Sequence, residues 1–486
     1  MPLLLNILIP AVFAGIIFFL GKRISAQQSR HLFVLCALLN FVSALLSQPL
    51  FALTQLGSWL FLDKFSAPIL LLSASLFVWV SIYAGGWLQA LDDMSRRGAE
   101  RDSGFRDPRL FPEHVFLSCT LLFLAAMNLA ISSANLGLFW VAIEATTLVS
   151  APLLCFQRSK AALEAMWKYL LICSLGIALA LLGLFFLAIA EPTQSGLNLF
   201  ALMEHSEALN LQWGKAAFIL ILAGYGTKMG LAPFHTWLPD AYSATPGLVS
   251  ALLSGALLNC AFLGIFRFTQ IMPAALLPSC RQMLLALGFL SLLTAAFFVV
   301  RQQNYKRLLG YSSIEHMGIL AIILACSLSN ADMQRVLLWH IIGHSLLKVA
   351  LFLLAGNIFL AYGTRSVTAV KGMFESMRWN AFLFLLCLLL LCGSPPSPLF
   401  VSELLLVFEL GPWLGAALLF LLFMVAAGML HAGMRMCMGT SPRQESMRKA
   451  ALLAERLFPM PAVAAFLALS FGVSLIFLLI RTYTIF

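Results

Sequence analysis

Charged side chains are scarce in this chain. Asp, Glu, Lys and Arg make up only 10% of its 486 residues, whereas about 25% is usual in a soluble domain. Hydrophobic residues make up 61%, and the mean hydropathy is +0.95. The sequence also lacks a phosphate-binding loop, a dinucleotide-binding Gly motif and a nucleophile elbow, so nothing indicates a nucleotide-binding or hydrolytic enzyme. We therefore expect a polytopic membrane protein with no active site of its own.

Paired cysteines and a clustered basic surface are missing as well. None of the ten cysteines has CxxC spacing, so the pattern favours small packing residues over iron–sulfur or zinc ligation. The net charge of +10 follows from basic loops, and no soluble basic face for a nucleic acid is present. We expect no cofactor and no metal in this chain, and no nucleic-acid partner.

Long apolar stretches dominate what is present. About 14 of them approach the roughly 20 residues that a membrane span requires. They are Leu3–Leu20, His31–Leu53, Ala67–Leu88, Pro112–Ile131, Asn135–Phe156, Leu163–Ala190, Trp213–Leu238, Leu248–Met272, Gln282–Val300, Leu308–Ser327, Met333–Ala361, Trp379–Glu409, Trp413–Met436 and Leu457–Ile480. The first stretch lacks the basic segment of a signal peptide, so we interpret it as a retained span.

Lys and Arg alternate between the loops. The odd-numbered loops are rich in them, whereas Glu191–Gln212 has none. The positive-inside rule places the odd-numbered loops in the cytoplasm and both termini outside. We expect Gln89–Arg109, with its mixed charges, to be a solvated cytoplasmic loop. The pattern predicts a multi-pass protein of a bacterial-type cytoplasmic (inner) membrane.

Two spans are interrupted by Gly and Pro beside an ionisable residue. The seventh contains Gly224–His235 around Lys228, and the twelfth contains Gly393–Glu403. Such residues break the helix ladder, and matching breaks in two halves of a transporter indicate an ion site. The fold class that we predict is an all-α membrane protein with two inverted five-helix repeats and broken helices 7 and 12. The predicted parts are 1–111, 112–272 for helices 4–8, 273–436 for helices 9–13, and 437–486.

Ionisable residues inside the spans form the candidate site, because each costs at least ~2.5–3.5 kcal/mol in hydrocarbon and usually marks an ion path. We expect Glu144 to pair with Lys228, either as a coupled proton-gating pair or as a structural ion pair. The i, i+4 and i+8 spacing of His340, His344 and Lys348 puts them on one helix face, where histidines can pass protons. The predicted proton-translocation residues are Glu144, Lys168, Lys228, His235, Lys306, Glu315, His316, His340, His344, Lys348 and Glu403.

Several of these residues have plainer alternatives. Lys168 could extend its ammonium to the membrane surface, and Lys306 lies in a stretch that already sets topology. Glu315 and His316 either extend the polar axis or pair locally. His340 and His344 lack the carboxylate of a His–Glu–x–x–His signature, so packing is a better alternative than metal binding.

Several strings resemble a known family. They are Trp140–Leu148, Trp167–Tyr169, Gly226–Ala241, Ser250–Asn259, Lys306–Ser313 and His344–Lys348. They resemble the antiporter-like membrane subunits of respiratory complex I, multi-subunit sodium/proton antiporters and membrane-bound hydrogenases, with the hydrogenase 4 component F branch as the nearest match. The resemblance implies a coupling pair at Glu144 and Lys228, a central relay at His340, His344 and Lys348, and a final acid at Glu403. Asn259 departs from the lysine that many members carry in span eight.

The resemblance implies a proton-translocating subunit of a multi-subunit redox complex, of the hydrogenase or formate hydrogenlyase type. Its partners would be other membrane and peripheral subunits, which would carry the iron–sulfur clusters and the nickel–iron centre. Open alternatives are a cation/proton antiporter subunit, a complex I subunit, a membrane partner of a carbon-capture complex, and a non-pumping anchor. The translocated ion is H⁺ or Na⁺.

Overall fold

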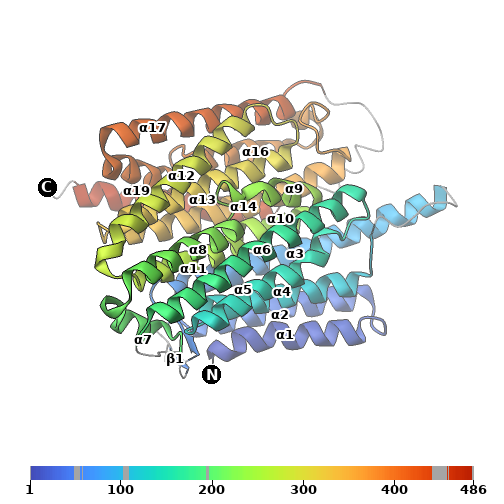
Figure 1. The fold of residues 1–486 in the computed structure, drawn as a ribbon. Coiled ribbons are helices and arrows are strands. Elements are labelled where there is room, and N and C mark those ends of the chain that lie inside the picture. The colour runs from blue at the N-terminus through green and yellow to red at the C-terminus, as the bar shows by residue number, and fades with distance from the viewer. Residues whose placement is uncertain are drawn as a thin grey trace. The chain divides into compact units, whose positions relative to one another are not determined.

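The chain folds almost entirely into helices. The computed structural model describes residues 2–48, 55–56, 59–101, 109–192, 196–440, 457 and 459–483 (Figure 1). Within these residues, thirteen helical segments are long and apolar enough to cross a membrane. The only strands described are β1, Gln55–Leu56, and β2, Leu60–Phe61, which pair antiparallel. The predicted all-α membrane class is confirmed.

The described chain divides into two compact units. Unit 1 is Met1–Trp237 with Ala256–Met283, and unit 2 is Leu238–Gly255 with Leu284–Phe486. The boundaries of the predicted four parts follow a different criterion and stay a prediction.

In unit 1, the helices α1, α2 and α4 pack against one another (Figure 1). The helices of this unit are α1 Pro2–Leu20, α2 Ala26–Leu46, α3 Ser66–Arg101, α4 Glu113–Ser132, α5 Leu136–Leu154, α6 Lys160–Ala190, α7 Leu199–Glu204, η1 Ser206–Ala208, α8 Leu211–Met229, η2 Phe234–Thr236, α11 Leu258–Gln270 and η4 Ala274–Leu276.

The helices of unit 2 surround α13 and α14, whose residues are mostly buried. Two helices have their first residues in unit 1. The helices are α9 Trp237–Ala244, α10 Gly247–Leu252, the π-helical turn η3 Leu253–Leu257, α12 Leu277–Val299, α13 Tyr305–Ser327, α14 Met333–Tyr362, α15 Met373–Ser376, α16 Arg378–Leu391, α17 Pro398–Cys437 and α19 Pro459–Tyr483.

Both predicted helix breaks are present. Helix α8 ends at Gly230, whose φ of 84° is the left-handed conformation that favours glycine. The indole N–H of Trp237 donates to the carbonyl oxygen of Thr227 at 2.8 Å, so a carbonyl freed by the break is satisfied inside the protein. Helix α16 ends before Gly393, with φ of 66°, and α17 begins after Ser397, whose hydroxyl accepts from the backbone N–H of Leu399.

One expectation about local structure was wrong. The segment Gln89–Arg109 is not a loop throughout, because α3 continues to Arg101; residues 102–108 lie outside the described residues. The predicted boundary between spans twelve and thirteen, between Glu409 and Trp413, is present. Gly411 is non-helical, with φ of 74°, and separates two helical segments within α17.

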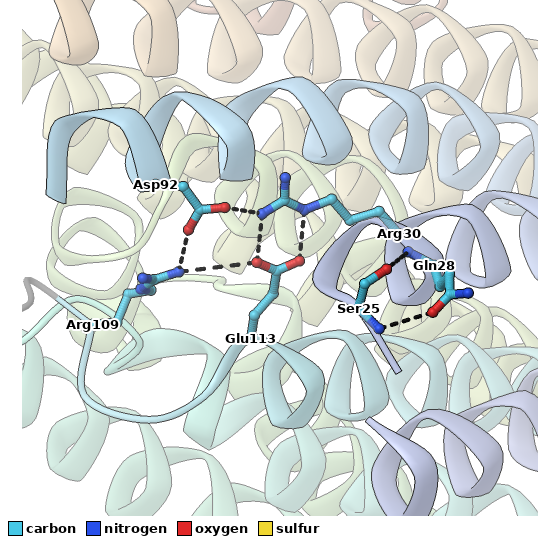
Figure 2. Close-up of polar contacts among 6 residues, drawn as sticks. All are labelled: Ser25, Gln28, Arg30, Asp92, Arg109 and Glu113. Carbon is cyan, nitrogen blue, oxygen red and sulfur yellow. Dashed lines mark hydrogen bonds and ion pairs between the residues drawn. The ribbon is translucent and has the colours of Figure 1, made fainter. Parts of the chain in front are cut away.

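An ion network links α3, at Asp92, to Arg30 of α2 and to Arg109. Arg30 donates to both carboxylate oxygens of Glu113 at 2.7 Å and to Asp92 at 2.5 Å (Figure 2). Arg109 donates to the other oxygen of Asp92 at 2.8 Å. Ser25 and Gln28 cap the start of α2 reciprocally, which orients this end of the helix.

Candidate functional site: two buried polar clusters

The first cluster surrounds Lys228 in unit 1. Lys228 is the last residue but one of α8 and is fully buried. Its ammonium donates to the hydroxyl of Thr147 on α5 and to that of Tyr169 on α6, each at 2.7 Å. The Tyr169 hydroxyl also lies 2.7 Å from that of Ser150. We call Thr147, Ser150, Tyr169 and Lys228 the lysine cluster; it is a continuous chain of groups that both donate and accept, apart from the ammonium itself.

Glu144 does not form the expected direct ion pair with Lys228. Its Oε1 accepts from the Ser174 hydroxyl at 2.9 Å, and its Oε2 has no partner among the described residues. Thr147, one turn further along α5, is fully buried, whereas Glu144 is partly exposed. The threonine therefore occupies the position beside the ammonium that the carboxylate was expected to take.

The second cluster lies in unit 2, where α13, α14 and α17 meet. Nδ1 of His316 is 3.3 Å from Nε2 of His340, and Nδ1 of His340 is 2.8 Å from the hydroxyl of Ser402. The rings of His316 and His344 are 5.1 Å apart between centroids. Glu403 follows Ser402, and one ligand-type atom from each of His316, His340 and Glu403 lies within 4.8 Å of the others. We call His316, His340, His344 and Glu403 the histidine cluster.

Two further lysines of unit 2 are buried with uncharged partners. Lys348 donates to the backbone carbonyl of Leu309 at 2.9 Å and is close enough to Glu315 for an electrostatic interaction. Lys306, on the first turn of α13, donates to the backbone carbonyl of Thr245, the residue after α9. A helix C-terminus is electronegative, so this position suits a cation.

The sequence shows which family this arrangement belongs to. A family model described as "NADH:quinone oxidoreductase/Mrp antiporter, TM" matches residues 133–432. That range is more than half of the chain and contains both clusters. The chain belongs to this NADH:quinone oxidoreductase/Mrp antiporter family.

Relatives within and around this family support the assignment. The "Hydrogenase-4 component F homolog" of Methylacidiphilum infernorum is 34% identical over 417 residues, which cover 84% of each chain. A chain of respiratory complex I from Thermus thermophilus aligns with a TM-score of 0.74 and 25% identity, covering 96% of this chain and 97% of that one. A chain of the Mrp complex from Dietzia sp. has the same fold, with a TM-score of 0.82, 18% identity and coverage of 98% and 95%.

Not every predicted proton-translocation residue lies in the lysine cluster or the histidine cluster. The side chain of Lys168 is 46% exposed and pairs with Glu164 at 2.6 Å, one turn back on α6. This is the surface position that the alternative interpretation described. His235 lies half-buried in η2, its Nδ1 has no partner among the described residues, and its role in proton translocation stays a prediction.

Sequence reasoning missed the hydroxyl groups. Thr147, Ser150 and Tyr169 hold or extend the contacts of Lys228, and Ser402 orients His340. One signal was available, because Thr147 and Tyr169 lie within strings that carry the family resemblance. Asn259, which occupies the span-eight position, is fully buried and directly follows the start of α11 after the π-helical turn η3; such turns are frequent at functional sites.

Proposed function

We propose that this chain is a proton-translocating membrane subunit of a multi-subunit redox complex, of the hydrogenase or formate hydrogenlyase type. The 34% identity to a hydrogenase-4 component F homolog supports this type. Electron transfer would take place in partner subunits, which would hold the iron–sulfur clusters and the nickel–iron centre. The chain would lie in the bacterial cytoplasmic (inner) membrane with both termini outside.

One observation carries the proposal. Lys228, Lys306 and Lys348 are each at most 2% exposed, and the hydrogen-bond acceptors described for each are uncharged oxygens. A buried charge without a directly bonded counter-ion is costly. Lysine, unlike arginine, can give up its proton. Lysines in this setting are suited to alternate between charged and neutral forms rather than to hold helices together.

In unit 1, the proton of Lys228 would leave through a chain of hydroxyl groups. The ammonium donates to Tyr169, whose hydroxyl is also bonded to that of Ser150. A hydroxyl can accept one proton and release another, so this chain can carry a proton away from Lys228. Glu144, one of whose oxygens has no partner in the part of the chain that the structure describes, supplies the negative charge whose position favours one form of Lys228 over the other.

In unit 2 the proposal assigns the proton path to the histidine cluster and Lys348. His316 and His340 are within hydrogen-bond distance, and His340 continues to Ser402, the neighbour of Glu403. An imidazole binds a proton on one nitrogen and releases it from the other. Glu403 is then the final acid, and Glu315 the counter-charge of Lys348.

The test is proton uptake into sealed vesicles that contain the assembled complex. We expect Lys228→Met to reduce redox-driven uptake at least ~100-fold, the lower end of the range for loss of a proton-transfer group. Lys215→Met, which changes an exposed lysine on the same helix, should leave uptake unchanged. Normal uptake by an assembled Lys228→Met complex would refute the proposal. Uptake of sodium rather than protons would favour the alternative of a cation/proton antiporter subunit.

A further inference from the structure

Three metal-ligand side chains converge from three different helices of unit 2. His316 belongs to α13, His340 to α14 and Glu403 to α17. One nitrogen of each histidine and one carboxylate oxygen lie within 4.8 Å of one another. The three side chains are 1%, 0% and 7% exposed. A buried carboxylate beside two imidazoles is a set that binds transition metals as well as protons.

Several polar atoms at this point have no partner among the described residues. They are Oε1 of Glu403 and both ring nitrogens of the neighbouring His344. A buried polar atom left without a hydrogen bond costs about 1–3 kcal/mol. Such atoms on Glu403 and His344, beside the facing nitrogens of His316 and His340, indicate that a ligand completes the site.

We propose that His316, His340 and Glu403 bind one Zn²⁺ ion. Zinc–nitrogen bonds of about 2.0–2.1 Å in tetrahedral geometry put two ligand atoms about 3.3 Å apart. The nearest nitrogens of His316 and His340 are already 3.3 Å apart. The carboxylate oxygen of Glu403 lies within 4.8 Å of these nitrogens. It would move at most roughly 1.5 Å toward them to reach the same spacing, which is within the range of side-chain rotation.

The surroundings also suit a zinc site. Metal-binding histidines usually bond to a second group through their other nitrogen, which fixes the ring, and Nδ1 of His340 lies 2.8 Å from the hydroxyl of Ser402. Three protein ligands leave the fourth position for water, and the neighbouring His344, whose ring nitrogens have no partner among the described residues, would accept a hydrogen bond from it. Two imidazoles make the set unsuitable for Ca²⁺ and Mg²⁺, which prefer oxygen ligands.

Binding can be measured on the purified full-length complex without any transport assay. After removal of metals, zinc is titrated in competition with a chromogenic chelator, and the zinc-loaded protein is examined by X-ray absorption. We expect one zinc ion per chain, with two imidazole nitrogens and one carboxylate in its coordination shell. His316→Ala, His340→Ala and Glu403→Gln should each weaken binding at least ~10-fold. His431→Ala, an exposed histidine on α17, should have no effect.

The X-ray absorption spectrum of the unmodified protein identifies the zinc ligands directly, so the test does not depend on every variant folding. Absence of stoichiometric zinc, or a coordination shell without imidazole, would overturn the site. Undiminished binding in a folded triple variant would overturn it as well.

One consequence rests on the proposed function. Zinc would occupy the nitrogens that the proposed relay uses, so it should inhibit proton uptake in the unmodified complex. Zinc that binds as described without inhibiting would support the site and contradict the relay. Zinc that does not bind, in a complex that pumps normally, would overturn the site and leave the relay standing.

Discussion

The hydroxyl of Tyr169 offers the sharpest test of the lysine cluster. It accepts from the ammonium of Lys228 at 2.7 Å and lies 2.7 Å from the hydroxyl of Ser150, so Tyr169→Phe removes these hydrogen bonds. The ring would stay, and with it the contact of the Lys228 ammonium 4.7 Å from the ring centroid. The substitution therefore removes the proton path with little loss of packing.

The size of the effect follows from the charge on the donor. A hydrogen bond to a charged group contributes about 1.5–3 kcal/mol. Because 1.4 kcal/mol corresponds to a factor of ten, the population of charged Lys228 should fall roughly 10- to 150-fold relative to the neutral form. If Lys228 must alternate between these forms in each cycle, proton uptake by vesicles should fall by about tenfold or more.

The matched control is Tyr225→Phe. Tyr225 is also a fully buried tyrosine of unit 1, on α8, but its hydroxyl has no partner among the described residues. Removing that hydroxyl should leave proton uptake unchanged. An assembled Tyr169→Phe complex that pumps at the rate of Tyr225→Phe would refute the hydroxyl path.

Three further predictions concern unit 2, topology and stability. His344→Ala and Lys348→Ala should each cut proton uptake while leaving assembly intact, and the double variant should show less than the sum of the two effects in free-energy units if they act in one relay; a double variant with normal uptake would make both residues packing groups. In a background without the native cysteines, Gln212→Cys should react with an impermeant thiol reagent in intact cells, whereas Arg158→Cys should not; the reverse pattern would invert the topology. Arg30→Ala should lower the thermal stability of the protein in detergent, because Glu113 loses both of its hydrogen bonds to Arg30 and Asp92 keeps only Arg109, at a cost of about 1.5–3 kcal/mol. Arg30→Lys, which keeps the charge and loses the bidentate contact, should cost less, and an unchanged midpoint in both variants would contradict the role of this network.

The sequence predicted the fold well because its signals are local. Each span is a continuous apolar run, and each break is marked by Gly and Pro in the chain itself, as at Gly230 and Gly393. The failures arose where the deciding contacts come from elsewhere in the chain. The polar end of α3 looks like a loop on its own, but Asp92 is tied to Arg30 of α2.

The candidate site was only partly predictable for the same reason. Hydropathy marks a buried charge such as Lys228, yet it does not name the partner. The expected partner was another charge, Glu144, whereas the structure has the hydroxyls of Thr147 and Tyr169 there. Lys168 and Tyr169 are neighbours in the sequence, but the rotation of α6 turns the lysine outward and the tyrosine inward.

The sequence by itself determined that this is a polytopic membrane protein of the antiporter-like family, with ionisable residues and helix breaks inside its spans. Those features depend on the composition of single segments, because each membrane-spanning helix satisfies its backbone hydrogen bonds within itself. Only the tertiary structure decided which polar groups meet. His316, His340 and Glu403 are separated by tens of residues and share no motif, and they converge because three helices cross at one point. Contacts of that kind depend on the rotation and crossing of helices, which no single segment encodes.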